Sequence, residues 1–200
     1  MNKIITIGRE FGSGGRELGK RLAEELNIAY YDWEIIEEIA KRTDLSKEYV
    51  DSVIEQQPTA SFTIHTGVSF SPLYYSVHIG NSAVIFQEKK KLLTELAEKG
   101  DCVIVGRCAD YVLRDYKPFR IFVYADMKSK LARCRKNEKD NLSLSNKKLI
   151  RHIKKVDKQR SRYYSFYTGK TWGDKLNYDL CVNTTEVNIE EIVPHIAKML

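Results

Sequence analysis

The sequence predicts an α/β fold of three layers, in which a parallel core sheet is flanked by helices on both faces. Two observations carry this prediction. Segments with strand patterns and segments with helix patterns alternate along the 200 residues, which is typical of a parallel sheet. Cys102–Val105 is continuously apolar and 120–124 nearly so, as expected for strands buried on both faces. We find no linker and no internal repeat, so we treat residues 1–200 as one domain.

The first 26 residues show a change from strand pattern to helix pattern. Lys3–Ile7 is a short β-branched run, and four residues at 12–15 follow it that are too rich in glycine for a regular element. Leu18, Leu22 and Leu26 then recur every four residues with charged residues between them, which predicts an amphipathic helix. Strand, glycine loop and helix in this order are the opening of a nucleotide-binding unit.

The remaining elements follow from the same patterns. Further strands are predicted at 29–31, 102–105, 120–124 and 180–182. Helices are predicted at 33–42, 46–56, 83–99, 126–137, 146–164 and 189–199, with Ser46 as an N-cap and a kink or a later start caused by Pro194. Residues 57–75 contain two prolines and a glycine. We interpret them as an inserted loop or hairpin that covers the functional site of the protein.

Charge is distributed unevenly along the chain. The formal net charge is +6, and 128–162 contains 14 Lys and Arg against 3 Asp and Glu. Such a basic segment can bind nucleic acid, a membrane surface or a polyphosphate, or it can form a solvated helix face. No apolar run approaches the roughly 18 residues of a membrane span, and the apolar stretch at the start is too short for a signal peptide. We therefore expect a cytoplasmic protein without a membrane partner.

Four cysteines, Cys102, Cys108, Cys134 and Cys181, form neither a CxxC pair nor a cluster with zinc spacing. We interpret them as reduced, buried thiols.

The glycine loop is a candidate phosphate site, because backbone N–H groups and a helix N-terminus attract anions. It deviates from the pattern GxxxxGK[ST]. With Gly14 in the second glycine position, Arg9 occupies the first, Gly15 the lysine position and Glu17 the Ser/Thr position. We expect Arg16 to supply the missing charge, and Glu17 to bind a metal or orient Arg16. The alternative is a tight turn that needs glycine only for packing. The candidate phosphate-binding residues are Gly12, Ser13, Gly14, Gly15, Arg16 and Glu17.

Several segments together resemble the cytidylate kinase-like family, and they do so nearly end to end and in the family's order. They are residues 8–19, 30–32, 102–107, 125–135, 157–164 and 180–184. The resemblance implies a P-loop NTPase fold with an acceptor-binding insert at about 33–82 and a lid at about 133–170. It also implies transfer of the γ-phosphoryl group of ATP, with Mg²⁺, to CMP or dCMP.

The resemblance assigns roles to single residues. Arg133 and Arg160 would approach the transferred phosphoryl group, and Arg16 would act with them. Residues near the acceptor nucleotide would be Asp32, Arg107, Asp157 and Arg162. No metal ligand is assigned. The chain departs from the family at the missing lysine and at Gln159, where an acid is frequent, and 57–80 does not align, which leaves the acceptor open.

Phosphoryl transfer suits these residues, because it needs positioning and positive charge on the phosphate oxygens. Two alternatives are a kinase with a non-nucleotide acceptor and a nucleotide-binding regulator that has lost catalysis. A third, an RNA-binding module, rests on aromatic residues among the basic ones. Packing of the lid explains these aromatic residues better, so we do not expect nucleic acid as a partner.

Overall fold

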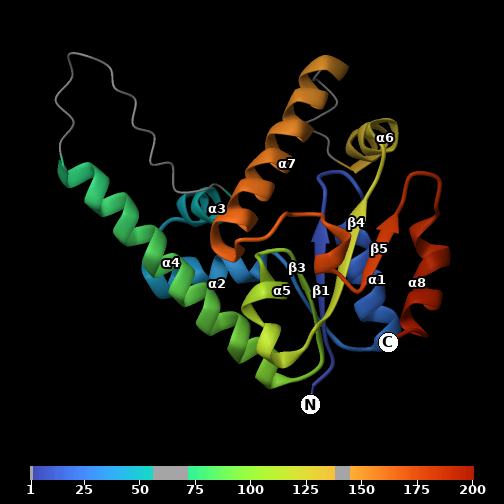
Figure 1. The fold of residues 1–200 in the computed structure, drawn as a ribbon, viewed down its shortest axis with the longest axis horizontal. Coiled ribbons are helices and arrows are strands. Elements are labelled where there is room, and N and C mark those ends of the chain that lie inside the picture. The colour runs from blue at the N-terminus through green and yellow to red at the C-terminus, as the bar shows by residue number, and fades with distance from the viewer. Residues whose placement is uncertain (1, 56–71, 138–144) are drawn as a thin grey trace.

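The computed structural model describes residues 2–55, 72–137 and 145–200, and it describes side chains there except at 55 and 72–80. Within this part of the chain, five parallel strands form one sheet in the order β2-β3-β1-β4-β5 (Figure 1). The strands are β1 (Ile4–Arg9), β2 (Ala29–Tyr31), β3 (Cys102–Val105), β4 (Phe119–Tyr124) and β5 (Leu180–Asn183). The predicted three-layer α/β fold is confirmed.

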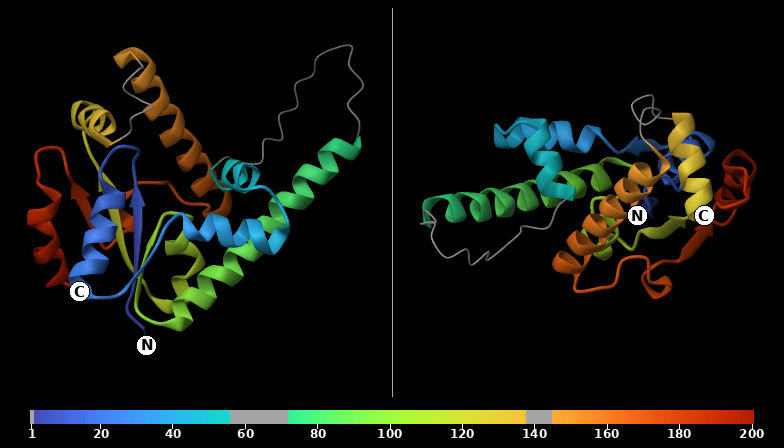
Figure 2. Two further views of the ribbon diagram at one scale, coloured as in Figure 1. Left: turned by 180° about the vertical axis from the view of Figure 1, so that it is seen from behind. Right: turned by 90° about the horizontal axis from the view of Figure 1, so that it is seen from above.

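One face of the sheet is covered by α1 (Gly15–Leu26) and α8 (Ile189–Ala197), which lie side by side in both views of Figure 2. Ile5 and Ile7 of β1 are fully buried against Leu18 and Leu22 of α1. The spacing of four residues that predicted α1 therefore forms its buried face. This packing fixes the start of α1 directly above the end of β1.

The opposite face is covered by α2 (Glu34–Thr43), α3 (Lys47–Glu55), α4 (Pro72–Lys99) and the short α5 (Ala109–Val112). Ile4 and Ile104 lie in this second core with Ile35, Ile39 and Leu93. The alternation of β1 side chains between two cores is the period of two that a strand imposes.

Two helices stand over the carboxyl ends of the strands, α6 (Met127–Asn137) and α7 (Asn146–Thr168) (Figure 1). α7 begins where Ser145 accepts a hydrogen bond from the amide of Lys148, a regular N-cap. Short 3₁₀ turns lie at Arg114–Tyr116 and Lys175–Asn177. Among the described helices, none is both long and apolar enough to cross a membrane.

The main difference from the sequence prediction concerns α4, which begins at Pro72 and not at residue 83. The stretch before 83 contains Gly80 and several β-branched or aromatic residues, which have low helix propensity. The predicted insert loop falls largely on 56–71, outside the described residues. Ser46 was predicted correctly as an N-cap: its hydroxyl accepts a hydrogen bond from the amide of Tyr49 at 3.2 Å. Pro194 lies within α8, which starts at Ile189 after the capping residue Asn188.

Candidate functional site

Most of the candidate residues lie at the carboxyl ends of the strands, where ligands bind in open parallel sheets. Arg9 ends β1, Asp32 follows β2, and Arg107 follows β3. Gly106 and Arg107 both have left-handed backbone angles, with φ of 74° and 60°. A Cβ on Gly106 would overlap the guanidinium of Arg9. The glycine therefore lets Arg9 pass under the turn after β3.

Asp32 is the carboxylate at the centre of this group. It is 2% exposed, and it forms a close ion pair with Arg16 from the first turn of α1. Arg9 approaches the other carboxylate oxygen at 3.8 Å. Arg107, whose side chain is buried, lies 3.7 Å from Asp51 of α3. Asp32 thus orients arginines from two different elements toward one place.

Trp33 follows Asp32, and its ring lies close to both Arg16 and Arg107. The guanidinium carbon of Arg16 is 5.2 Å from the centre of its ring, and that of Arg107 is 5.9 Å from it. Both distances suit a cation–π interaction. The Trp33 side chain is not part of a core cluster among the described residues, and the residue is 48% exposed.

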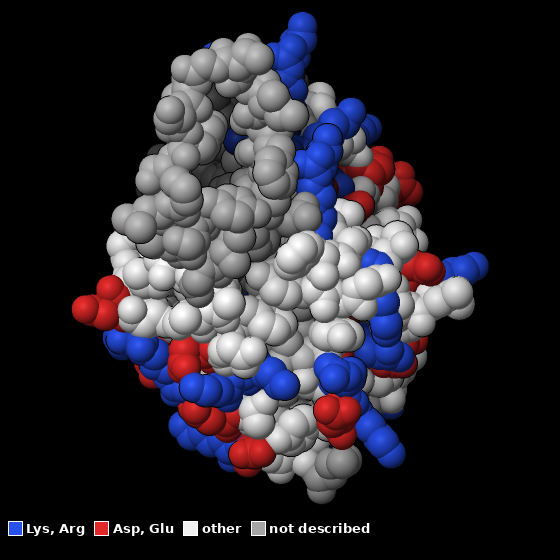
Figure 3. Space-filling model, turned by 60° about the vertical axis from the view of Figure 1, so that its left-hand side comes forward, with Lys and Arg blue, Asp and Glu red and all other residues white. Residues whose placement is uncertain are grey.

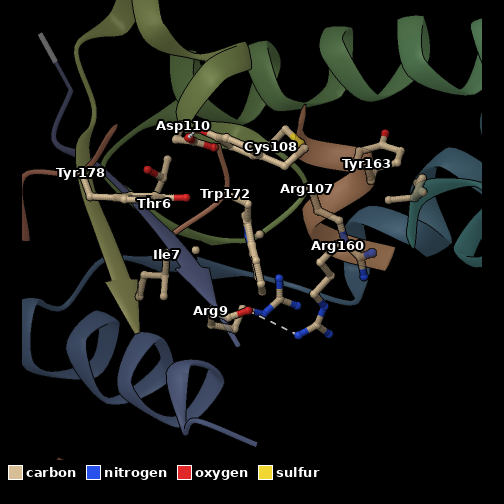
Figure 4. A pocket seen from close by; sticks show the side chains of 14 residues that line it. Thr6, Ile7, Arg9, Arg107, Cys108, Asp110, Arg160, Tyr163, Trp172 and Tyr178 are labelled. Carbon is tan, nitrogen blue, oxygen red and sulfur yellow. Dashed lines mark hydrogen bonds between the residues drawn. The ribbon is translucent and has the colours of Figure 1, made fainter. Parts of the chain in front are cut away.

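A small cavity of about 50 Å³ opens beside the arginines (Figure 4). Arg9, Arg107 and Arg160 line one end of it, with Trp172 between them and the polar far end. The far end is lined by Thr6, Asp110 and Tyr178, among others. The Nη1 of Arg160 donates to the carbonyl oxygen of Arg9 at 3.5 Å. Arginines from β1, from the turn after β3 and from α7 therefore face one space.

The glycine loop is shaped as a cradle. Gly12 and Gly14 have φ of 75° and 84°, a region that favours glycine. A Cβ on Gly14 would overlap Ile189, and one on Gly15 would overlap the side chain of Arg9. The hydroxyl of Thr184, after β5, donates to the carbonyl oxygen of Ser13 at 2.6 Å and holds the loop in place.

Arg133 of α6 lies against this cradle: a Cβ on Gly14 would be 3.5 Å from its Nε. Its Nη2 donates to the carbonyl oxygen of Thr184. Its Nη1 is buried, with no hydrogen-bond partner among the described residues. The first amides of α1 likewise lack a carbonyl one turn earlier in the helix. An unpaired cationic donor beside a glycine cradle fits a bound phosphate group.

Asp157 ties three elements together. One carboxylate oxygen accepts from the amide of Phe11 in the glycine loop at 2.6 Å, and the other accepts from Lys130 of α6 at 3.1 Å. Lys130 is 5% exposed and also pairs with Glu10 at 2.7 Å. Asp157 in α7 is therefore a clamp between the loop and the two helices above it.

Not every predicted residue joins the site. Glu17 pairs with Arg21 on the surface of α1 at 3.1 Å, whereas Arg16 pairs with Asp32. Arg162 is exposed, and no hydrogen bond, ion pair or ring contact of its side chain is found among the described residues. Sequence reasoning missed Arg9, Lys130 and Trp33 as site residues. A sequence signal for Arg9 did exist, because Arg9 stands in the first glycine position of the loop pattern.

Among the described residues, no group of three or more His, Cys, Asp or Glu could hold a metal.

Behind the arginines, α4 and α7 meet at a buried lysine. The ammonium of Lys89 donates to the hydroxyl of Tyr163 at 2.7 Å and lies over the rings of Phe86, Tyr163 and Tyr167. Burial lowers the pKa of Lys89 from 10.5 to about 8, because desolvation penalises the charged form. Burial also raises the pKa of the nearby Cys108 thiol to about 12.

The cysteines are reduced, and Cys102, Cys108 and Cys134 are buried as predicted, with Cys181 partly exposed.

Comparison with known proteins agrees with this geometry. The sequence model of the cytidylate kinase-like family matches residues 4–186. A cytidylate kinase of Staphylothermus marinus is 24% identical over 189 residues, which are 94% of this chain and 90% of the relative.

Solved structures extend the comparison to the fold. An uncharacterized protein from Eubacterium ventriosum has a TM-score of 0.70 at 29% identity, covering 98% of this chain and 97% of that one. A shikimate kinase from Bacteroides thetaiotaomicron has a TM-score of 0.59 at 15% identity, covering 100% and 98%, and this likeness concerns the fold alone. Because the family match spans nearly the whole chain and includes every strand of the sheet, the protein belongs to the cytidylate kinase-like family.

Proposed function

We propose that the protein transfers the γ-phosphoryl group of Mg-ATP to a nucleoside monophosphate, with CMP and dCMP as the first candidates. Family membership supports a kinase that acts on a nucleotide or another small molecule. The observation that carries the proposal further is the convergence of arginines on Asp32 and on one cavity at the strand ends. Two anionic reactants can approach each other there because their charges are compensated.

The donor phosphates fit the glycine loop. The backbone of Gly12–Arg16 and the N-terminus of α1 supply N–H groups and positive dipole. Arg133 adds a buried guanidinium whose Nη1 has no partner among the described residues. A magnesium ion would arrive with ATP and neutralise charge on its phosphate oxygens.

The acceptor phosphate fits the arginine end of the cavity, with Arg107 and Arg160 as its ligands and Arg9 behind them. In the reaction, an oxygen of the acceptor phosphate bonds to the γ-phosphorus as the bond to the β-phosphate oxygen breaks. Arg16, in the first turn of α1 and paired with Asp32, would offset the negative charge that develops on the transferred group. Fixed guanidinium groups need no reorganisation at that moment, which is the main source of catalysis in such sites.

Asp157 stays a proposed contributor to the acceptor site, but its contacts favour an indirect role. Both carboxylate oxygens are engaged by Phe11 and Lys130. By holding α7 on the glycine loop, Asp157 would keep Arg160 close to Arg9. Arg162, being exposed, would reach the acceptor only through a movement of α7, as lids of kinases make.

RNA binding finds less support. On the face drawn in Figure 3, Lys and Arg side chains are interspersed with Asp and Glu over the described surface. In α7, Tyr163 and Tyr164 are buried and Tyr167 is stacked on Phe86, whereas Phe166 is exposed. Tyr163 and Tyr167 therefore form part of the packing between α4 and α7, and the hydroxyl of Tyr164 donates to Asp110 of α5.

The test offers purified protein, ATP and Mg²⁺ together with CMP, dCMP, UMP, AMP or GMP, and measures ADP release. We expect release that depends on CMP or dCMP. Arg107→Ala should raise the acceptor KM, while Arg114→Ala is the matched control, because Arg114 stacks on Tyr111 away from the strand ends. Release with a non-nucleotide acceptor alone would indicate a small-molecule kinase. ATP binding without release for any acceptor would indicate a regulator and refute the proposal.

A further inference from the structure

Trp33 is an exposed tryptophan with a fixed backbone. It precedes α2 directly, and its carbonyl oxygen accepts from the amides of Ile36 at 3.0 Å and Glu37 at 3.3 Å. The neighbouring Asp32 is buried. The indole is thus attached to a rigid junction between β2 and α2, although it is half exposed itself. An exposed aromatic ring in such a place is not needed for the core.

The two partners of the ring come from opposite sides of the site. Arg16 belongs to the first turn of α1, beside the glycine loop, and Arg107 belongs to the turn after β3 that lines the acceptor cavity. Their guanidinium carbons lie 5.2 Å and 5.9 Å from the ring centre. The indole therefore joins one cation of the proposed donor side to one cation of the proposed acceptor side.

The departure of the loop from the usual pattern makes this contact useful. A lysine in the loop is positioned by the loop itself, but Arg16 is one residue later and half of its side chain is exposed. A long, exposed side chain loses much rotamer entropy when it is fixed. Asp32 fixes one edge of the guanidinium, and a flat ring can fix its plane without competing for the N–H donors that phosphate needs.

We propose that Trp33 is a positioning residue, whose indole fixes the positions of the Arg16 and Arg107 guanidinium groups relative to each other, between the donor and acceptor phosphates. This inference rests on the proposed function for its kinetic consequence. Its spectroscopic consequence requires only that ATP or CMP binds. Trp33 touches no reacting atom in this assignment and acts through the two arginines.

The kinetic test compares Trp33→Leu and Trp33→Phe with the parent protein, in which Trp172 is kept. Because a leucine has no π face, we expect Trp33→Leu to lower kcat/KM by roughly 5- to 30-fold, mostly in kcat. Trp33→Phe keeps a ring and should stay within about threefold of the parent. The melting temperature should change little in both, as for exposed positions generally. Phe166→Leu, at another half-exposed aromatic residue, is the matched control.

The spectroscopic test uses the fact that the chain has two tryptophans, so Trp33 is the single one in a Trp172→Phe variant. Mg-ATP should change its emission by placing phosphate charge beside Arg16 while the indole keeps that guanidinium in position, and CMP should do so through Arg107. Arg16→Ala should abolish the response to ATP and keep that to CMP, and Arg107→Ala should do the reverse.

Three outcomes separate this inference from the proposed function. Turnover with normal kcat/KM in Trp33→Leu would overturn the inference and leave the function standing. Trp33 emission that stays unchanged on addition of either ligand, in a protein that is active, would also overturn the inference. An emission response that depends on Arg16, without ADP release for any acceptor, would support the pairing and refute the function.

Discussion

Arg16 is the residue that we propose supplies the positive charge of the missing lysine. Its guanidinium pairs with the buried Asp32 and faces Trp33. We expect Arg16→Ala to lower kcat by about 10²- to 10³-fold, the usual cost of losing a charged donor in such a site. Arg16→Lys should recover part of this loss. Steady-state ADP release measures both variants, and Arg21→Ala, which removes an exposed pair with Glu17 on the same helix, should be nearly normal. Normal turnover in Arg16→Ala would move the role to another arginine.

Lys89 gives the protein a stability that depends on pH. The unfolded chain keeps the proton of this lysine up to its ordinary pKa of 10.5, whereas the folded chain releases it at about 8. Between these values the unfolded state binds more protons, so stability rises with pH. Below pH 8 the penalty is complete, at about 3 kcal/mol. As pH falls from 10.5 to 8, this much stability is lost.

Replacing Lys89 by methionine should remove that dependence. We expect Lys89→Met to flatten the free energy of unfolding between pH 8 and pH 10, measured by urea titration at several pH values. Other groups titrate in this range, so the comparison is made with Lys90→Met, whose lysine is the exposed neighbour on α4. Equal slopes in the two variants would mean that Lys89 is not desolvated in the folded protein.

At the scale of elements, the glycine loop depends on a backbone conformation. Gly14 has φ of 84°, and a Cβ there would overlap Ile189 of α8. Gly14→Ala must therefore strain the backbone and push the Ile189 side chain aside, and we expect a loss of about 2–3 kcal/mol together with weaker ATP binding. Gly100→Ala is the control, because that glycine is outside the left-handed region and has open space around it. Thermal melts with and without ATP measure both effects, and equal melting temperatures for the two variants would contradict the clash.

The clamp at Asp157 links α7 to the glycine loop and α6. Asp157→Asn leaves Lys130, which is nearly buried, with Glu10 as its remaining carboxylate partner. We expect a loss of about 2 kcal/mol of stability, since a buried charge loses a partner. The KM for ATP should rise because the amide of Phe11 is held less firmly. If the melting temperature is unchanged and only the acceptor KM rises, Asp157 binds the acceptor directly, as the family resemblance implies.

The elements could be predicted wherever a period or a cap marks them in the sequence. β2 and β3 were predicted with their exact bounds, and the α7 start at Asn146 agrees with the serine cap before it. The start of α4 could not be found, because no helical signal precedes residue 83. In the candidate site, the glycine loop indicated Arg16 and the family resemblance indicated Arg107, and the structure places both guanidinium groups near the Trp33 ring. Trp33 was missed because only the assembled sheet brings it between arginines of two other elements.

At the scale of the whole molecule, the arginines at the carboxyl ends of the strands fall into two groups on opposite sides of the proposed site. Arg133 from α6 and the glycine loop lie on the proposed donor side. Arg107 and Arg160, from the β3 turn and α7, lie on the proposed acceptor side. A chain that binds two ligands in separate places gains stability from each of them. At a concentration of about 100 Kd, each ligand adds about 2.7 kcal/mol, which corresponds to roughly 5–10 °C for a domain of this size.

This arrangement predicts that two variants will each lose the melting-temperature shift caused by one ligand and keep the shift caused by the other. The two ligands are a non-hydrolysable ATP analogue and CMP. Arg133→Ala should lose most of the shift caused by the analogue and keep the shift caused by CMP. Arg107→Ala should lose the CMP shift and keep that of the analogue, because its guanidinium is separated from the glycine loop by Asp32 and Trp33. Arg114→Ala should keep both, since its cation stacks on Tyr111 at the opposite end of β4. If either variant lost both shifts equally, the arginines would serve a single shared anion site, and the two-sided arrangement on which phosphoryl transfer depends would be wrong.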